Sequence, residues 1–80
     1  MRLKKNIATS ESGFIFNPGT GDSFSANEVG TEIIFLMKDG MDSGSIKNKI
    51  LLRYDVEEAQ LNKDFDDLIM QLRDHNLLEG

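Results

Sequence analysis

The chain has 80 residues, of which 39% are hydrophobic and 29% are charged, and it contains no cysteine. These values predict one folded domain, residues 1–80, held together by apolar packing, and they exclude a disulfide framework and a thiolate metal site. The formal net charge is −5, and residues 57–80 alone carry seven acids against two bases, so the surface should repel the phosphates of nucleic acid.

Three short strands are predicted before any helix. Leu3–Ile7 is compatible with a lysine-rich edge strand, and Thr9–Gly13 with a turn. Phe14–Phe16 is a β-favouring run that stops at the turn residues Asn17–Asp22. Ser23–Ala26 should return antiparallel, and the alternation of side chains then predicts one apolar and one polar face for the sheet.

Two helices are predicted next. Asn27 is a typical N-cap, and the first helix should end at Lys38, with Gly40 as a left-handed residue after it. The stretch Asp42–Ser45 is typical of a cap for a second, short helix that ends near Asp55.

A third helix is expected from about Val56 to Asn76, with Asp55 and Glu58 spaced like a capping box. Its apolar residues recur within a narrow arc, which predicts the core face; they are Leu61, Phe65, Leu68 and Leu72. The predicted fold class is therefore α+β: an N-terminal three-stranded antiparallel sheet followed by a winged-helix-like bundle of three helices.

The sequence contains no segment that predicts insertion into a membrane or secretion. The longest apolar run, Ile33–Met37, is far shorter than the ~20 residues that a membrane-spanning helix needs. Met1–Asn6 does not continue into the apolar stretch of a secretory signal. We therefore expect a soluble cytoplasmic protein.

The sequence predicts no catalytic, metal or cofactor site. His75 is the single histidine and has no cysteine to join it in a metal site. Asp66 and Asp67 are adjacent on the predicted helix, so they should point about 100° apart rather than share a cation. Gly19-x-Gly21 precedes a strand and lacks the Gly-Lys-Ser/Thr of a phosphate loop. We expect a protein that is not an enzyme.

The order of features over residues 3–79 resembles the PqqD family, the peptide chaperones of pyrroloquinoline quinone biosynthesis. Their fold recurs as the recognition element for leader peptides of ribosomally made, modified peptides. The residues that carry the resemblance are Phe16-Asn17 and a turn, Asn27-x-x-Gly30, Ile33, Leu36, Asp39-Gly40, Ile46, Tyr54 and Asp64-Phe65-x-x-Leu68-Ile69-x-x-Leu72-x-x-x-Asn76-Leu77-Leu78. The chain departs from the family at Asn76, where Gly is frequent, and at Gly30, where Ala is frequent.

The resemblance implies that a leader or precursor peptide binds as an added strand between the third strand and the third helix. It also implies a maturation enzyme as partner, of the radical-SAM or another type, and no cofactor. Ile69 would then take an apolar anchor of the peptide, and Arg73 an acidic residue. The peptide-binding residues carried over are Ser23, Phe24, Ser25, Ala26, Asp66, Ile69, Met70 and Arg73.

Two other classes of function stay open on the sequence. A winged-helix DNA-binding domain has the same inventory of elements, although the acidity of the third helix argues against it. An adaptor or subunit of a kinase-like or other enzyme system is compatible with the wide apolar flank of the first helix, where Ile34 and Phe35 could form a homodimer interface.

Overall fold

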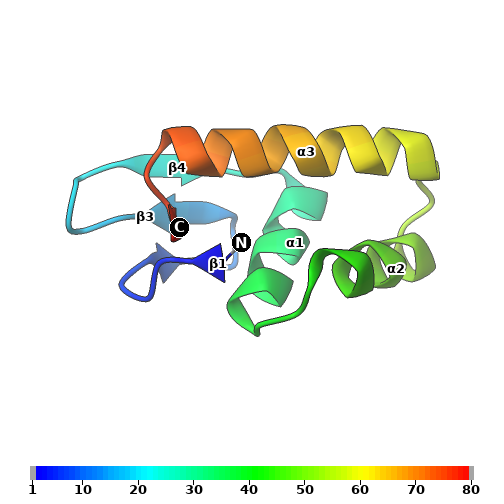
Figure 1. The fold of residues 1–80 in the computed structure, drawn as a ribbon, viewed down its shortest axis with the longest axis horizontal. Helices are drawn as coiled ribbons and strands as arrows, with labels where there is room; N and C mark the ends of the chain where they lie inside the picture. The colour runs from blue at the N-terminus through cyan, green and yellow to red at the C-terminus, as the bar shows by residue number, and fades with distance from the viewer. Residues whose placement is uncertain (1, 80) are drawn as a thin grey trace.

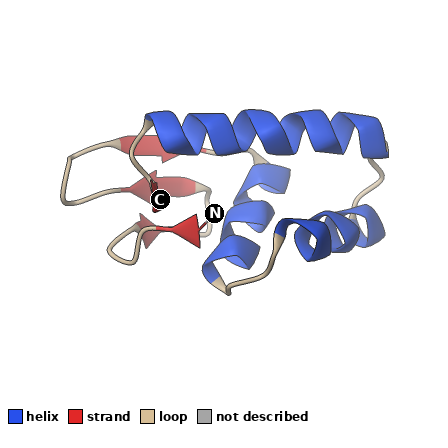
Figure 2. Cartoon of the chain, viewed as in Figure 1, coloured by secondary structure: helices blue, strands red, loops and turns tan. Residues whose placement is uncertain are grey.

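A computed structural model describes residues 2–79 and has the predicted α+β architecture. Its elements are β1 (Arg2–Leu3), β2 (Ala8–Thr9), β3 (Phe14–Phe16), β4 (Ser23–Ser25), α1 (Glu28–Lys38), α2 (Ser43–Arg53), α3 (Glu58–Asp74) and β5 (Leu78–Glu79). The strands β2, β3 and β4 form an antiparallel sheet, and β1 pairs with β5. Helix α3 has its C-terminal end beside β4 and passes over α1 and α2 along the rest of its length, while the β3–β4 turn extends beyond it (Figures 1 and 2).

The first strand of the sheet is not where the sequence placed it. The predicted strand Leu3–Ile7 is wrong, because Ala8–Thr9 pairs with β3 and the chain turns before it, with Ile7 N–H donating to Lys4 C=O. This turn lets both Leu3 and Ile7 reach the core, where they are buried. Arg2–Leu3 pairs instead with Leu78–Glu79, a contact between distant segments that local patterning does not reveal.

The outer face of the sheet differs from the predicted polar face. The register pairs Phe14 with Ser25 and Phe16 with Ser23, so both phenylalanines share the solvent side with both serines. Ile15 and Phe24 pair on the opposite side and pack on the core. The expected separation into one apolar and one polar face is therefore wrong, and the outer face is mixed.

The caps of α1 and α2 are those that the sequence predicts. Asn27 Oδ1 accepts a hydrogen bond from Gly30 N–H at 2.8 Å, and Gly40 follows α1 with a φ of 88°. Asp42 Oδ1 accepts from Ser45 N–H at 2.7 Å. This hydrogen bond to the charged carboxylate holds the pKa of Asp42 below its ordinary value of 3.8.

Helix α3 begins later than predicted. Glu57 occupies the cap position in an extended conformation and makes no side-chain capping bond, so the predicted capping box of Asp55 and Glu58 is wrong. The other end is as expected, since Asn76 has a φ of 58° and Leu77 N–H donates to a carbonyl of the last turn. Leu77 is thereby turned into the core.

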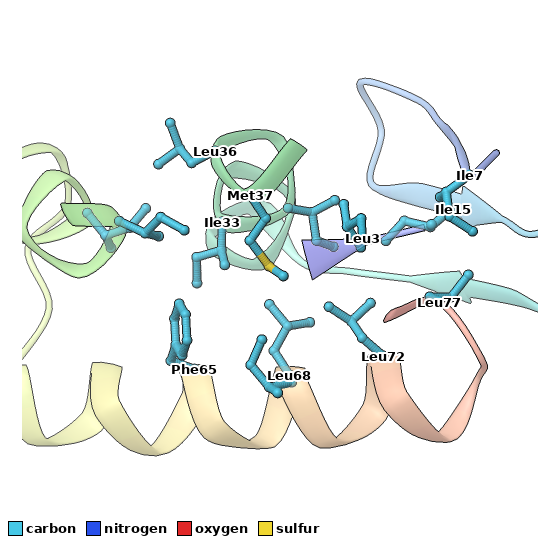
Figure 3. Packing of buried hydrophobic residues seen from close by; sticks show 14 of the residues in the cluster. Leu3, Ile7, Ile15, Ile33, Leu36, Met37, Phe65, Leu68, Leu72 and Leu77 are labelled. Atoms are coloured by element: carbon cyan, nitrogen blue, oxygen red, sulfur yellow. The ribbon is translucent and has the colours of Figure 1, made fainter. Parts of the chain in front are cut away.

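The core lies where α3 crosses the sheet and α1. Phe65, Leu68 and Leu72 of α3 point toward Ile33 and Met37 of α1 (Figure 3). The complete set of buried apolar residues is Leu3, Ile7, Ile15, Ile33, Ile34, Leu36, Met37, Ile46, Ile50, Leu61, Phe65, Leu68, Ile69, Leu72 and Leu77.

The apolar docking surface expected on α1 is mostly buried. Ile34 is only 2% exposed and belongs to the core, while Phe35 is partly exposed. The surface expected from Ile34 and Phe35 together is therefore not available, and a homodimer through α1 stays a prediction without that support. Within residues 2–79, no helix has both the length and the apolar character required to cross a membrane.

Candidate functional site

Strand β4 has an unpaired edge. Ala26 N–H donates to Gly13 C=O, and Asn17 N–H donates to Asp22 C=O. Hydrogen-bonded and non-hydrogen-bonded pairs alternate along an antiparallel ladder, so the backbone N–H and C=O groups of Ser23 and Ser25 point away from β3. Within residues 2–79, β4 pairs with β3 alone, which leaves these groups open to another strand.

A hollow of about 350 Å³ lies between the C-terminal part of β4, the start of α1 and α3. We call it the β4–α3 groove. Its lining residues are Phe24, Ser25, Ala26, Asn27, Val29, Gly30, Ile33, Asp64, Asp67, Leu68 and Gln71. The free backbone edge thus borders a groove that has apolar residues from all three elements and polar residues along its wall on α3.

Asn17 ties the hairpin to the end of α3. Its side chain is 1% exposed, its Nδ2 donates to Asn76 C=O at 2.8 Å, and its Oδ1 accepts from Gly19 N–H at 2.9 Å. Nearby, the rings of Phe24 and His75 lie 5.4 Å apart, between centroids. Both contacts hold β4 at a set distance from the C-terminal half of α3, so they fix the width of the groove at this end.

Gly30 shapes the other end of the groove. A Cβ atom at this position would lie 3.1 Å from the Cβ of Ala26 and 3.1 Å from Oδ1 of Asn27. The glycine therefore lets the first turn of α1 pack closely against the end of β4. The departure from the alanine that is frequent in the family thus falls on a residue that lines the groove.

The predicted site residues separate into two places. Phe24, Ser25 and Ala26 line the β4–α3 groove, and Ser23 is the first residue of the same strand. The four predicted residues of α3 lie instead in a second hollow, of about 360 Å³, toward the start of α2. We call it the α2–α3 hollow; it is lined by Ser43, Lys47, Phe65, Asp66, Ile69, Met70 and Arg73. A peptide-binding role for these α3 residues stays a prediction.

The sequence prediction missed the wall that faces β4. Asp64, Asp67, Leu68 and Gln71 follow the spacing i, i+3, i+4, i+7, which marks one face of a helix. That periodicity was readable in the sequence. The sequence does not show which side of the core stripe turns toward β4, because that depends on how α3 packs against the sheet.

The same division separates two acidic side chains. Asp67 lines the β4–α3 groove and Asp66 the α2–α3 hollow, as their adjacent positions on a helix predict. Among residues 2–79, no group of three or more His, Cys, Asp or Glu side chains is arranged to hold a metal ion. His75 contacts Phe24, and its Nδ1 lies 2.7 Å from Gln71 C=O.

Fold and groove together define a class: a small α+β domain in which an open strand edge lies beside the last long helix. The family model described as coenzyme PQQ synthesis protein D (PqqD) matches residues 13–78. The chain belongs to the PqqD family, which confirms the resemblance found in the sequence.

Two solved structures share the whole fold. TbiB1 in complex with the TbiA(beta) leader peptide is 24% identical, with a TM-score of 0.88 over 100% of this chain and 96% of that one. Lasso peptide synthetase B1 complexed with the leader peptide is 17% identical, with a TM-score of 0.82 over 99% of this chain and 96% of that one. No curated protein matches the chain.

Proposed function

We propose that the chain is a non-catalytic carrier that holds a leader or substrate peptide as an added β-strand between β4 and α3 and presents it to a separate maturation enzyme. The observation that carries the proposal is the open backbone of Ser23 and Ser25 beside the β4–α3 groove. A bare strand edge is a template for another strand, and recognition of this kind needs no catalytic group.

The groove offers both affinity and selectivity. The N–H and C=O groups of Ser23 and Ser25 give four backbone positions for hydrogen bonds, each contributing a net ~0.5–1.5 kcal/mol. Alternate side chains of the guest would face the groove, where Val29 of α1 and Leu68 of α3 supply apolar contact. Such a site suits an extended segment of a flexible peptide.

The comparisons support the same proposal. Both similar solved structures are named as complexes with a leader peptide, and the family model is that of a protein of coenzyme PQQ synthesis. The DNA-binding alternative gains no support from the structure, because α3 carries five acids against Lys63 and Arg73 and would repel phosphate.

Selection of peptides on the immobilised protein tests the proposal. The library consists of random peptides of about 12 residues, long enough to pass the whole of β4 at about 3.3 Å per residue. The best binder is then titrated into isotope-labelled protein. We expect the amide shifts to map to residues 23–27 and 64–71, with the Ser25 amide among the largest.

Ser25→Pro is the decisive variant. Proline removes the outward N–H and places its ring at the open edge, while an edge strand tolerates it. We expect peptide affinity to fall more than about tenfold, because hydrogen bonds and close approach are both lost. Ser25→Ala keeps the N–H and should bind like the unchanged protein. Binders that map elsewhere, or that bind Ser25→Pro equally well, would overturn the proposal, as would a failure to select any binder.

A further inference from the structure

The charged side chains that line the β4–α3 groove are both acidic. Asp64 and Asp67 stand three residues apart on the wall formed by α3. Gln60 Nε2 donates to one oxygen of Asp64 at 2.8 Å, and this amide brings no positive charge to the carboxylate. Across the part of the chain that the structure describes, the one ion pair joins Arg53 to Glu32, so neither groove carboxylate has a cationic partner from this chain.

Acidic character continues past the end of β4. An adjoining hollow shares Ala26 and Asn27 with the groove, and its charged lining residues are Glu11, Glu28 and Glu32. Glu32 is paired with Arg53, whereas Glu11 and Glu28 are exposed. Both hollows that border Ala26 and Asn27 are therefore lined by acidic side chains.

The α2–α3 hollow has the opposite balance. Lys47 and Arg73 outnumber Asp66 there, giving +1 from 2 bases minus 1 acid. The Nζ of Lys47 lies 4.8 Å from the centroid of the Phe65 ring, which keeps this cation on the α2 side of α3. The two hollows on either side of α3 are therefore lined by side chains of opposite net charge.

Spacing shows how a guest would meet the two groove carboxylates. Residues i and i+3 of a helix have their side chains about 5–6 Å apart, and alternate residues of a strand lie on one face about 6.6 Å apart. Figure 1 shows β4 beside the C-terminal end of α3, where Phe24 contacts His75. Asp67 and Asp64 lie about two and three helical turns before that contact, where the groove reaches the start of α1. A guest strand that follows β4 and continues past Asn27 would therefore bring alternate side chains beside Asp67 and then Asp64. The long, flexible side chains of Lys and Arg can accommodate the small difference between the helix spacing and the strand spacing.

We propose that the peptide held in the β4–α3 groove is basic, with Lys or Arg at alternate positions on the side that faces α3, opposite Asp64 and Asp67. The inference rests on the proposed function and adds the chemical class of the peptide. Acidic residues on that side of the guest are rejected, because like charges would face each other across the groove.

The peptide selection described above tests this inference when it is run in parallel on three proteins. They are the unchanged chain, the double variant Asp64→Asn with Asp67→Asn, and Asp66→Asn as the matched control on the other side of the same helix. We expect Lys and Arg to be enriched at alternate positions on the unchanged chain and on Asp66→Asn. The enrichment should disappear on the double variant.

Affinity gives a second readout. A selected basic peptide should bind the double variant roughly three- to tenfold more weakly, as two partly exposed ion pairs allow. High salt should weaken binding to the unchanged chain by a similar factor and leave the double variant almost unaffected.

The outcomes separate the two proposals. Binders that are lost on Ser25→Pro but show no excess of Lys or Arg, or bind the double variant equally well, would overturn the charge inference and leave the added strand in place. Binders that survive Ser25→Pro would overturn both. Equal loss of binding on Asp66→Asn would show that the helix contributes only net charge, and it would also overturn the assignment to Asp64 and Asp67.

Discussion

The two sides of α3 carry hollows of nearly equal size and differ in what borders them. The β4–α3 groove measures about 350 Å³ and the α2–α3 hollow about 360 Å³. The first lies against a strand edge with open backbone groups, and the second lies between two helices, whose backbone groups are satisfied internally. Volume alone therefore does not single out a peptide site. The unpaired backbone of β4 is what distinguishes the first hollow, because it offers directional hydrogen bonds to an extended chain.

The largest expected effect comes from two adjacent apolar residues of α3, Leu68 and Ile69, which line different hollows. Leu68 and Ile69 are each 8% exposed, so Leu68→Ala and Ile69→Ala should each lower the free energy of unfolding by about 2–4 kcal/mol. Urea denaturation measures this. Peptide affinity should distinguish the two variants. It should fall for Leu68→Ala, because Leu68 lines the groove, and stay unchanged for Ile69→Ala as long as that variant is folded.

Two more conservative substitutions serve if the alanine variants are too unstable to assay. Leu68→Val and Ile69→Val should each cost about 1 kcal/mol and leave the protein folded for titration. Equal loss of peptide affinity in both variants would move the binding surface to the apolar stripe as a whole. Loss in the Ile69 variant alone would favour the α2–α3 hollow as the peptide site.

Asn17→Ala should have the next largest effect. It loosens the β4 side of α3, where Asn17 joins the hairpin to the end of the helix, and leaves the α2 side unchanged. The change leaves Asn76 C=O and Gly19 N–H without the partners that Asn17 supplies. Because these bonds are only part-buried, we expect a cost of about 1 kcal/mol. Amide hydrogen exchange should speed up in the β3–β4 turn and at the end of α3, and peptide affinity should fall as the groove loses its fixed width. Asn6→Ala, which removes a 3.5 Å contact to the same side chain, is the control and should change little.

The smallest expected effect is on the α2 side. Met70 is 59% exposed and Arg73 is exposed, so the double variant Met70→Gln with Arg73→Gln should change the free energy of unfolding by no more than ~0.5 kcal/mol. Peptide affinity should stay within about twofold, since neither residue lines the groove. Calorimetric titration checks this. A large loss would restore the sequence-based prediction that these residues touch the peptide.

The sequence predicted most elements because their signals are local. Asn27 and Asp42 cap helices through hydrogen bonds to N–H groups three residues on, and Gly40 ends α1 with a positive φ; each is legible in a few residues. The core stripe of α3 was likewise readable from its period. The strand pair β1–β5 was not, because it joins residues more than 70 positions apart, where no short-range pattern exists.

The candidate site shows the same limit. The edge strand Ser23–Ser25 was predicted from its turn and its alternation. The predicted residues of α3 line the α2–α3 hollow, and their role in peptide binding stays a prediction. Periodicity says that Asp64, Asp67, Leu68 and Gln71 share a face. It does not say which face turns toward β4, since that depends on the crossing of α3 over the sheet and on the bond from Asn17 to Asn76.

By itself, the sequence determined an α+β domain, its helix caps, its core stripe, the family to which it belongs and an acidic third helix. Only the tertiary structure decided that Phe14 and Phe16 face solvent, that Ile34 is buried, and that Asp64 and Asp67 rather than Asp66 and Arg73 border the open edge. The reason is physical: caps and periods follow from hydrogen bonds and turns within a few residues, whereas the sides of a helix differ only through what packs against them.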